Sequence, residues 1–281
     1  MPNMFEGRNL VIATKHKKED QIAPILKKEL GVVCMVPQNF DTDMLGTFSG
    51  EVEREFDPLT TARKKCEWAM LITDSDLAIA SEGSFGPHPS FAFIPADEEW
   101  LVFIDKRNEL EIVVREISTT TNFAAQFCKN RDELEEFAKR AQFPGHGLIM
   151  RTSKQDTSTI VKDIRQWDEL LKHFSVFCGA HGGAYVETDM RAMHNPMRMD
   201  VIKEATKKLV NKIKAVCPQC HTPGFGITNA KPGLPCNDCG SSTKSTLYVE
   251  YTCQKCTFTK QEKYPNKKQT EDPMYCDQCN P

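Results

Sequence analysis

Eight cysteines in the last quarter of the chain are the residues whose spacing most directly predicts chemistry. They form four Cys-x-x-Cys pairs: Cys217/Cys220, Cys236/Cys239, Cys253/Cys256 and Cys276/Cys279. Two cysteines separated by two residues place both sulfurs on one tight turn, and a zinc ion is held by four thiolates in a tetrahedron. Four such pairs therefore predict two closed sites that hold two structural zinc ions.

The spacing of the pairs predicts which of them share an ion. Successive pairs are separated by 15, 13 and 19 residues, which favours two consecutive zinc ribbons over residues 217–240 and 253–280. Closed four-sulfur sites leave no coordination position for water, so they indicate folding or docking rather than zinc catalysis. A disulfide framework is the alternative, and it belongs to oxidising compartments. Because residues 1–10 contain no apolar signal-peptide core, we expect a soluble, cytoplasmic protein.

Composition divides the chain at residue 216. Residues 1–216 contain enough leucine, isoleucine, valine and phenylalanine for a sizeable core, whereas residues 217–281 are polar and would need their metals to fold. The net charge is −3 over 281 residues, so the chain has no excess of basic residues that would favour nucleic-acid binding. No apolar run approaches the roughly 20 residues that span a bilayer, and we expect no membrane contact. The sequence leaves two alternatives for the ribbons, binding of a protein or binding of a nucleic acid.

The first 216 residues alternate between two periodicities. Short apolar runs typical of buried strands are followed by segments with apolar residues at helical spacing. This alternation predicts an α/β domain with a mixed sheet covered by helices. Asn195 is expected to cap the last helix, with Pro196 in its first position. We predict strands at 9–14, 32–36, 77–80, 100–104, 110–117, 147–150, 159–164 and 184–187, and helices at 18–30, 59–73, 132–141, 167–174 and 196–216.

Polar residues after buried strands are the candidates for chemistry, because ligands of open α/β sheets bind beyond the carboxyl ends of the strands. The first cluster lies between the first strand and a helix, where backbone amides and lysines can meet a phosphate. It consists of Thr14, Lys15, His16, Lys17 and Lys18. A solvated helix entrance is the alternative. The strand at 77–80 leads into a turn-like segment that contains Glu82, Ser84 and His88. There a carboxylate can hold magnesium or act as a base toward water.

A third polar cluster precedes the last helix. Arginine is unfavourable near a helix N-terminus, so an anion held between the arginines and the backbone amides would explain their presence. A salt bridge from an arginine to Asp189 is the alternative. Glu51 and Glu53 form a further acidic group that can complete a metal site. The third cluster consists of Asp189, Arg191, His194, Asn195 and Arg198.

Several motifs resemble known families. ASEGSFGPHP, TDMRAMHNPMRM and the CPQC and GLPCNDCG segments resemble a family known only as a domain of unknown function with a zinc-ribbon end. More distantly, the order of motifs resembles the inosine/xanthosine triphosphate pyrophosphatases, which use magnesium to cut nucleoside triphosphates to monophosphate and pyrophosphate. The motifs that carry this second likeness are residues 12–15, residues 60–64, residues 80–84 and residues 194–198.

The second resemblance implies a mechanism. Glu82 with Glu51 or Glu53 would hold magnesium, Lys15 and Arg198 would bind the triphosphate, and water would attack phosphorus. This sequence departs from the family in three ways. His16 stands near the position of the family's asparagine, the single Glu82 replaces the paired aspartates of one branch, and the family has no zinc ribbons.

Two hypotheses about function follow. One is a magnesium-dependent hydrolase of nucleoside triphosphates or other phosphorylated metabolites. The other is a non-enzymatic adaptor whose ribbons bind protein or nucleic acid. The remaining cysteines have no pairing pattern and are expected to be buried core thiols: Cys34, Cys66, Cys128 and Cys178.

Overall fold

The computed structural model describes residues 4–38, 40, 55–156 and 158–281. The chain divides into two compact units, Met1–Leu209 and Val210–Pro281. The division falls within helix α5 (Pro196–Lys214), seven residues before the predicted boundary at residue 216. Val216, the last residue of the helix that we predicted over 196–216, lies beyond the end of α5 and is 46% exposed. None of the described helices is long and apolar enough to cross a membrane.

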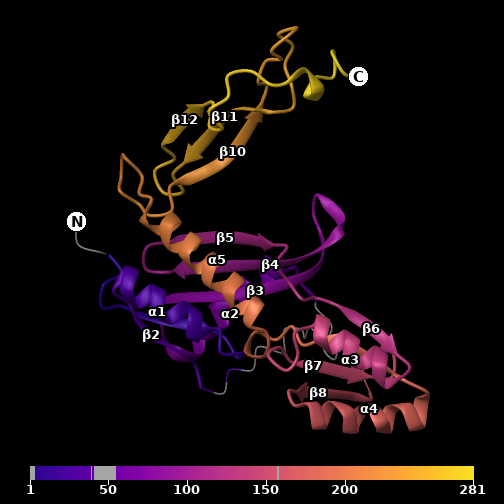
Figure 1. Cartoon of the computed structure of the whole chain (residues 1–281). Coiled ribbons are helices and arrows are strands. Elements are labelled where there is room, and N and C mark those ends of the chain that lie inside the picture. The colour runs from indigo at the N-terminus through magenta and orange to yellow at the C-terminus, as the bar shows by residue number, and fades with distance from the viewer. Residues whose placement is uncertain (1–3, 39, 41–54, 157) are drawn as a thin grey trace. The chain divides into compact units, whose positions relative to one another are not determined.

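A mixed sheet forms the centre of the first unit, as predicted (Figure 1). Its strand order is β2-β1-β3-β4-β5. β1 pairs in parallel with β2 and β3, while β3–β4 and β4–β5 are antiparallel. The strands are β1 (Asn9–Ala13), β2 (Val33–Met35), β3 (Leu77–His88), β4 (Phe91–Asp105) and β5 (Leu110–Ser118).

The long β3–β4 hairpin corrects one prediction. We expected the strand to end at Ala80 and a turn to follow, because Gly83, Gly86 and Pro87 disfavour regular strands. Instead β3 continues to His88 and pairs with β4 over its whole length. β1 ends at Ala13 opposite Ala80, so among the described strands only β4 borders β3 beyond that point. The hairpin ladder outweighs the local turn propensity, and an open edge of β3 follows Ala80.

Helices cover this sheet on both faces. Side chains of a strand alternate between the two faces, and Ala78 and Ala80 pack with α2 through Ala62 and Cys66. Helix α2 begins with Asp57 as its N-cap, whose carboxylate accepts from the Thr60 amide. Ion pairs from α5 to β4 and β5 place its first part over those two strands. The helices are α1 (Glu19–Leu30) and α2 (Pro58–Thr73), with α5 as above.

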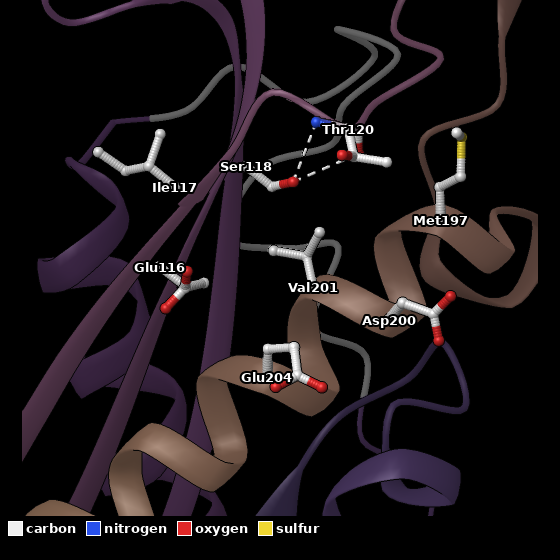
Figure 2. Close-up of a pocket in the computed structure, with 8 residues that line it drawn as sticks. All are labelled: Glu116, Ile117, Ser118, Thr120, Met197, Asp200, Val201 and Glu204. Atoms are coloured by element: carbon white, nitrogen blue, oxygen red, sulfur yellow. Dashed lines mark hydrogen bonds between the residues drawn. The ribbon is translucent and has the colours of Figure 1, made fainter.

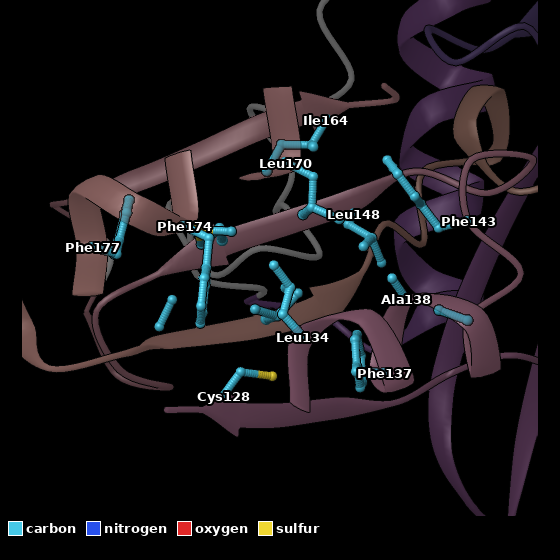
Figure 3. Close-up of a cluster of buried hydrophobic side chains, with 14 residues drawn as sticks. Cys128, Leu134, Phe137, Ala138, Phe143, Leu148, Ile164, Leu170, Phe174 and Phe177 are labelled. Atoms are coloured by element: carbon cyan, nitrogen blue, oxygen red, sulfur yellow. The ribbon is translucent and has the colours of Figure 1, made fainter. Parts of the chain in front are cut away.

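A second sheet, not foreseen as separate, completes the first unit. Its strand order is β6-β9-β7-β8, and all its pairs are antiparallel. Apolar side chains of the strands and of two helices form its core, as Figure 3 shows for Leu134, Leu148 and Phe174. The elements are β6 (Ala125–Cys128), α3 (Arg131–Arg140), β7 (Leu148–Arg151), β8 (Ile160–Ile164), α4 (Trp167–His181), β9 (Ala184–Thr188) and the short 3-10 helix η2 (Ala192–His194).

The second unit contains one three-stranded antiparallel sheet, β10-β11-β12. β11 lies in the centre, and its Val249 is buried. The outer strands are almost wholly exposed, so the sheet has little core of its own. The elements are β10 (Gly226–Pro232), β11 (Thr246–Thr252), β12 (Thr259–Lys263) and the 3-10 helix η3 (Pro273–Tyr275).

Candidate functional sites

The two cysteine tetrads lie in the second unit. Cys217 and Cys220 group with Cys253 and Cys256, and Cys236 and Cys239 group with Cys276 and Cys279. The Sγ–Sγ distances across the groups are 3.7 Å (Cys217–Cys256), 3.6 Å (Cys220–Cys253), 3.8 Å (Cys236–Cys279) and 3.6 Å (Cys239–Cys276). A tetrahedron with Zn–S bonds of about 2.3 Å separates its sulfurs by about 3.8 Å. The geometry of both tetrads therefore fits zinc.

The grouping differs from the prediction. We expected consecutive pairs to share an ion, as two ribbons over 217–240 and 253–280, and this was wrong. The first pair joins the third, and the second pair joins the fourth. The reason is the sheet, because antiparallel pairing of β10 with β11 brings Gly226, just after the first pair, opposite Thr252, just before the third. The two sites are thus interleaved along one small fold.

Six buried charged side chains form a cluster at the open edge of β3, which we call the buried charge cluster. On the α2 face, Lys65 Nζ lies 2.5 Å from Glu82 Oε2, and both residues are less than 8% exposed. Glu82 lies on β3 two residues beyond Ala80, which pairs with the last residue of β1. A ligand of an open sheet would bind at this position. The cluster consists of Lys18, Lys65, Glu82, Asp97, Glu99 and Arg198.

On the opposite face, Arg198 of α5 bonds to β4. Its Nε donates to Glu99 Oε1 at 2.6 Å, and its Nη1 donates to the Met190 carbonyl at 2.5 Å. Gly83 makes this contact possible. A Cβ at that position would lie 2.5 Å from Arg198 Nη2 and 2.5 Å from Glu99 Oε1. The glycine that we assigned to a turn therefore serves close packing inside a strand.

Lys18 joins the cluster from the residue before α1. Its Nζ donates to the carbonyl and the hydroxyl of Ser81, both at 2.9 Å. Burial and the nearby charge of Arg198 lower the pKa of Lys18 to about 7. Burial and the charge of Glu99 raise the pKa of Asp97 to about 8. The charges of the cluster therefore lie close enough to influence one another's protonation near neutral pH.

The structure buries only part of the first predicted phosphate loop. Thr14 is buried, and its hydroxyl has no hydrogen-bond partner among the described residues. Lys15 is exposed and His16 is half-buried, whereas Lys18, the last residue of the same predicted segment, is buried in the cluster. The backbone at Lys17 has a φ of 57°, and the chain then enters α1 with Lys18 turned inward.

The other predicted acids and hydroxyls are dispersed. Ser84 lies further along β3 and is half-buried. His88 ends the strand six residues from Glu82, a span of about 20 Å in extended chain, so it does not join the cluster. Its Nδ1 accepts from the amide of Ser90 instead. Glu51 and Glu53 lie outside the described residues.

The third predicted cluster divides into two parts. Arg191 donates to Asp189 Oδ2 at 2.6 Å and to Asp163 Oδ1 at 3.0 Å, and His194 Nε2 lies 2.8 Å from the same Asp163 oxygen. Only Arg198 reaches the buried charge cluster. The two arginines therefore have separate carboxylate partners. Although Asp163, Asp189 and His194 bring ligand atoms within 4.8 Å of one another, the Arg191 guanidinium already supplies their counter-charge.

Asn195 connects this region to α5. As predicted, it caps the helix, since its Oδ1 accepts from the amide of Arg198 at 3.0 Å. Its Nδ2 donates to Asn122 Oδ1 at 2.8 Å. These bonds hold the start of α5 and thereby help to position the Arg198 side chain.

Sequence reasoning missed three members of the cluster: Lys65, Asp97 and Glu99. One signal was present. In the segment Ala96–Asp97–Glu98–Glu99, acids two residues apart precede an apolar strand, and alternation places Asp97 and Glu99 on one face. Lys65 stood beside the 60–64 motif, but helical position alone does not predict that a lysine is buried.

A groove between β5 and α5 is a different kind of site. It has a volume of about 200 Å³, and Figure 2 shows Glu116, Asp200 and Glu204 around it. Ser118, Ile117, Thr120, Met197 and Val201 complete the lining, which contains no basic residue. Glu116 and Glu204 are paired with Lys208 and Lys207, which lie outside the lining, so the lining itself presents only acidic charged groups to a phosphate. The groove is therefore a poorer candidate for an anionic ligand than the buried charge cluster.

Comparison with known families assigns most of the chain to one family. A family model described as "Domain of unknown function (DUF6671)" matches residues 65–281. Because the match covers most of the chain, this protein belongs to that family. It includes Lys65, the β3–β4 hairpin, α5 and both cysteine tetrads. A search of curated proteins found no match.

Proposed function

We propose that the first unit is a magnesium-dependent hydrolase that cleaves a phosphoanhydride bond of a nucleoside triphosphate or a related phosphorylated metabolite. The observation that carries this proposal is the buried charge cluster, where three carboxylates face three cationic groups at the open edge of a strand. Burying six charges is costly unless they are paired or used. A ligand that carries both phosphate and a divalent cation complements both signs of charge.

The residues divide into roles by their chemistry. Lys18 and Arg198 supply positive charge toward phosphate oxygens. Glu82 is oriented by Lys65 and is placed to accept a proton from water. The attacking water oxygen forms a bond to phosphorus, the bridging P–O bond breaks, and the leaving phosphate or pyrophosphate carries away the electron pair. Magnesium would neutralise the charge of the phosphate oxygens, and the carboxylate oxygens of the cluster are the donors that it prefers.

The resemblance to the inosine/xanthosine triphosphate pyrophosphatases supports the same reaction class. Thr14, Glu82 and Arg198 are motif residues of that resemblance, and all three are buried at or beside the cluster. In place of Lys15, which the resemblance implies, we assign the phosphate-facing role to Lys18. The Lys18 Nζ bonds to Ser81, the residue that precedes Glu82 in β3.

Pyrophosphate release from a panel of nucleoside triphosphates with magnesium tests this proposal. Wild-type protein is expected to release pyrophosphate from at least one nucleotide, and Glu82→Gln is expected to reduce the rate by about 100-fold or more. Glu98→Gln is the matched control, since Glu98 lies on β4 and bonds to Arg115 and Trp100. Absence of release from every nucleotide, or equal rates for wild type and Glu82→Gln, would contradict the proposal.

A further inference from the structure

Two carboxylates of β4 are buried with too few hydrogen-bond donors. Asp97 is 1% exposed and Glu99 is 0% exposed. Asp97 Oδ1 and Glu99 Oε2 have no hydrogen-bond partner within the described ranges. A buried polar atom without a partner costs roughly 1–3 kcal/mol, and more if it is charged. Two such oxygens on residues two apart in one strand therefore indicate a missing cation or donor.

The two side chains face the same side of the sheet. They are two residues apart on an extended strand, and their cross-strand partners are Phe85 and Gly83. Their Cα atoms are separated by about 7 Å. Burial and the charge of Glu99 both raise the pKa of Asp97, so the two carboxylates lie close enough to repel each other. A divalent ion bound by both would remove this repulsion and would occupy the oxygens that lack a partner.

A third buried oxygen near the open edge of β3 also lacks a partner. Thr14 follows Ala13, the last residue of β1, which pairs with Ala80 of β3. The Thr14 Oγ1 has no hydrogen-bond partner among the residues that the structure describes. This unsatisfied hydroxyl at the end of β1 is independent of the two acids, and it is a further buried polar group that a ligand would satisfy.

Within the described residues, one oxygen of each carboxylate stays without a hydrogen bond although cationic side chains lie nearby. Arg198 Nε donates to Oε1 of Glu99, and Lys18 Nζ donates to Ser81. Glu82 is less available, since it is paired with Lys65 on the other face of the sheet. Oxygen ligands on a rigid strand suit magnesium or manganese, which bind carboxylates at about 2.0–2.2 Å.

We propose that Asp97 and Glu99 together bind a divalent metal ion, magnesium or manganese, on the α5 face of the sheet. This assignment differs from the one implied by the resemblance, which uses Glu82 with Glu51 or Glu53. It rests on the proposed function only for the role of the metal in hydrolysis, because metal binding can be measured without a nucleotide.

Titration of the zinc-loaded full chain with Mn²⁺, followed by the electron paramagnetic resonance signal of the free ion, tests the assignment. Wild type is expected to bind Mn²⁺, and Asp97→Asn to weaken binding by at least about tenfold. Glu99→Asp, which keeps the charge beside Arg198, is expected to weaken it as well. Glu98→Gln, whose carboxylate bonds to Arg115 and Trp100 in the wild type, should leave Mn²⁺ binding unchanged. Zinc content and tryptophan fluorescence establish that each variant is folded.

The outcomes separate this inference from the proposed function. If folded Asp97→Asn and Glu99→Asp bind Mn²⁺ as wild type does, or if wild type binds none, the metal assignment is wrong even where nucleotides are hydrolysed. If Mn²⁺ binding depends on Asp97 but no nucleotide is hydrolysed, the metal site stands and the hydrolase proposal fails.

Discussion

The cysteine tetrads of the second unit and the buried charge cluster of the first are built in opposite ways. Each tetrad is assembled from two local turns, and every one of its residues can be recognised by spacing. The charge cluster takes one residue before α1, one from α2, one from β3, two from β4 and one from α5. A site whose ligands are close together in the sequence can be recognised from the sequence. A site assembled from five parts of the fold depends on strand register and packing, which the sequence does not show directly.

The sharpest test of the tetrads is Cys253→Ser. Loss of one of four thiolates should release one of the two zinc ions and destabilise the second unit. With interleaved pairing, Cys217, Cys220 and Cys256 should become reactive toward a thiol reagent, while the tetrad of Cys236 stays protected. Zinc quantification and mass spectrometry of alkylated peptides measure both effects. Exposure of Cys276 and Cys279 instead would restore the consecutive arrangement.

The next largest effect is expected at the α2 side of the cluster. Lys65→Met removes the ammonium partner of buried Glu82 and should lower the free energy of unfolding by about 3–5 kcal/mol. All three tryptophans lie in the first unit, so denaturation followed by tryptophan fluorescence reports on that unit. The double variant Lys65→Met/Glu82→Leu should recover much of the loss, since it leaves no unpaired charge. Failure of this recovery would argue against the ion pair as the cause.

A smaller effect is expected at Gly83. Gly83→Ala places a Cβ against Arg198 and Glu99 and should cost about 1–3 kcal/mol through overpacking. Gly86→Ala is a matched control in the same strand, because a Cβ there meets nothing within 4 Å. Its effect should stay within about 0.5 kcal/mol. Equal losses for the two variants would mean that strand propensity, and not the Arg198 contact, makes Gly83 necessary.

The smallest effect concerns pH. His146 Nε2 accepts from the amide of Met197 near the start of α5, and burial lowers the pKa of His146. The unfolded chain takes up the proton at about pH 6.5, whereas the folded protein resists it, so stability is lost as the pH falls below that value. His146→Gln should reduce this dependence by about 1 kcal/mol or less between pH 7.5 and 5.5. Denaturation curves at both pH values measure it, and an unchanged slope would exclude His146 as the cause.

The elements of the first unit were largely predictable. β1, α1 and α2 follow directly from apolar periodicity, and the cap by Asn195 follows from its position before Pro196. The extension of β3 to His88 could not be predicted in this way, because its glycines and proline indicate a turn. Pairing with β4 supplies hydrogen bonds that local propensity does not include.

The candidate site was predictable only in part. Glu82 and Arg198 were selected from the sequence, and both are buried in the cluster. Lys15 was selected because it follows a strand, but Lys18 is the lysine that turns inward. Which of several adjacent lysines is buried depends on the backbone conformation just before α1. The residue types alone do not predict that conformation.

The amino-acid sequence by itself determined that eight thiols form four turns suited to zinc and that an alternating α/β fold precedes them, because both signals depend on residues close together in the chain. Only the tertiary structure decided which thiol pairs meet and which charges are buried together. Sheet pairing made those choices. The β10–β11 ladder joins the first cysteine pair to the third, and the β3–β4 ladder brings Gly83 opposite Glu99, where Arg198 can reach it.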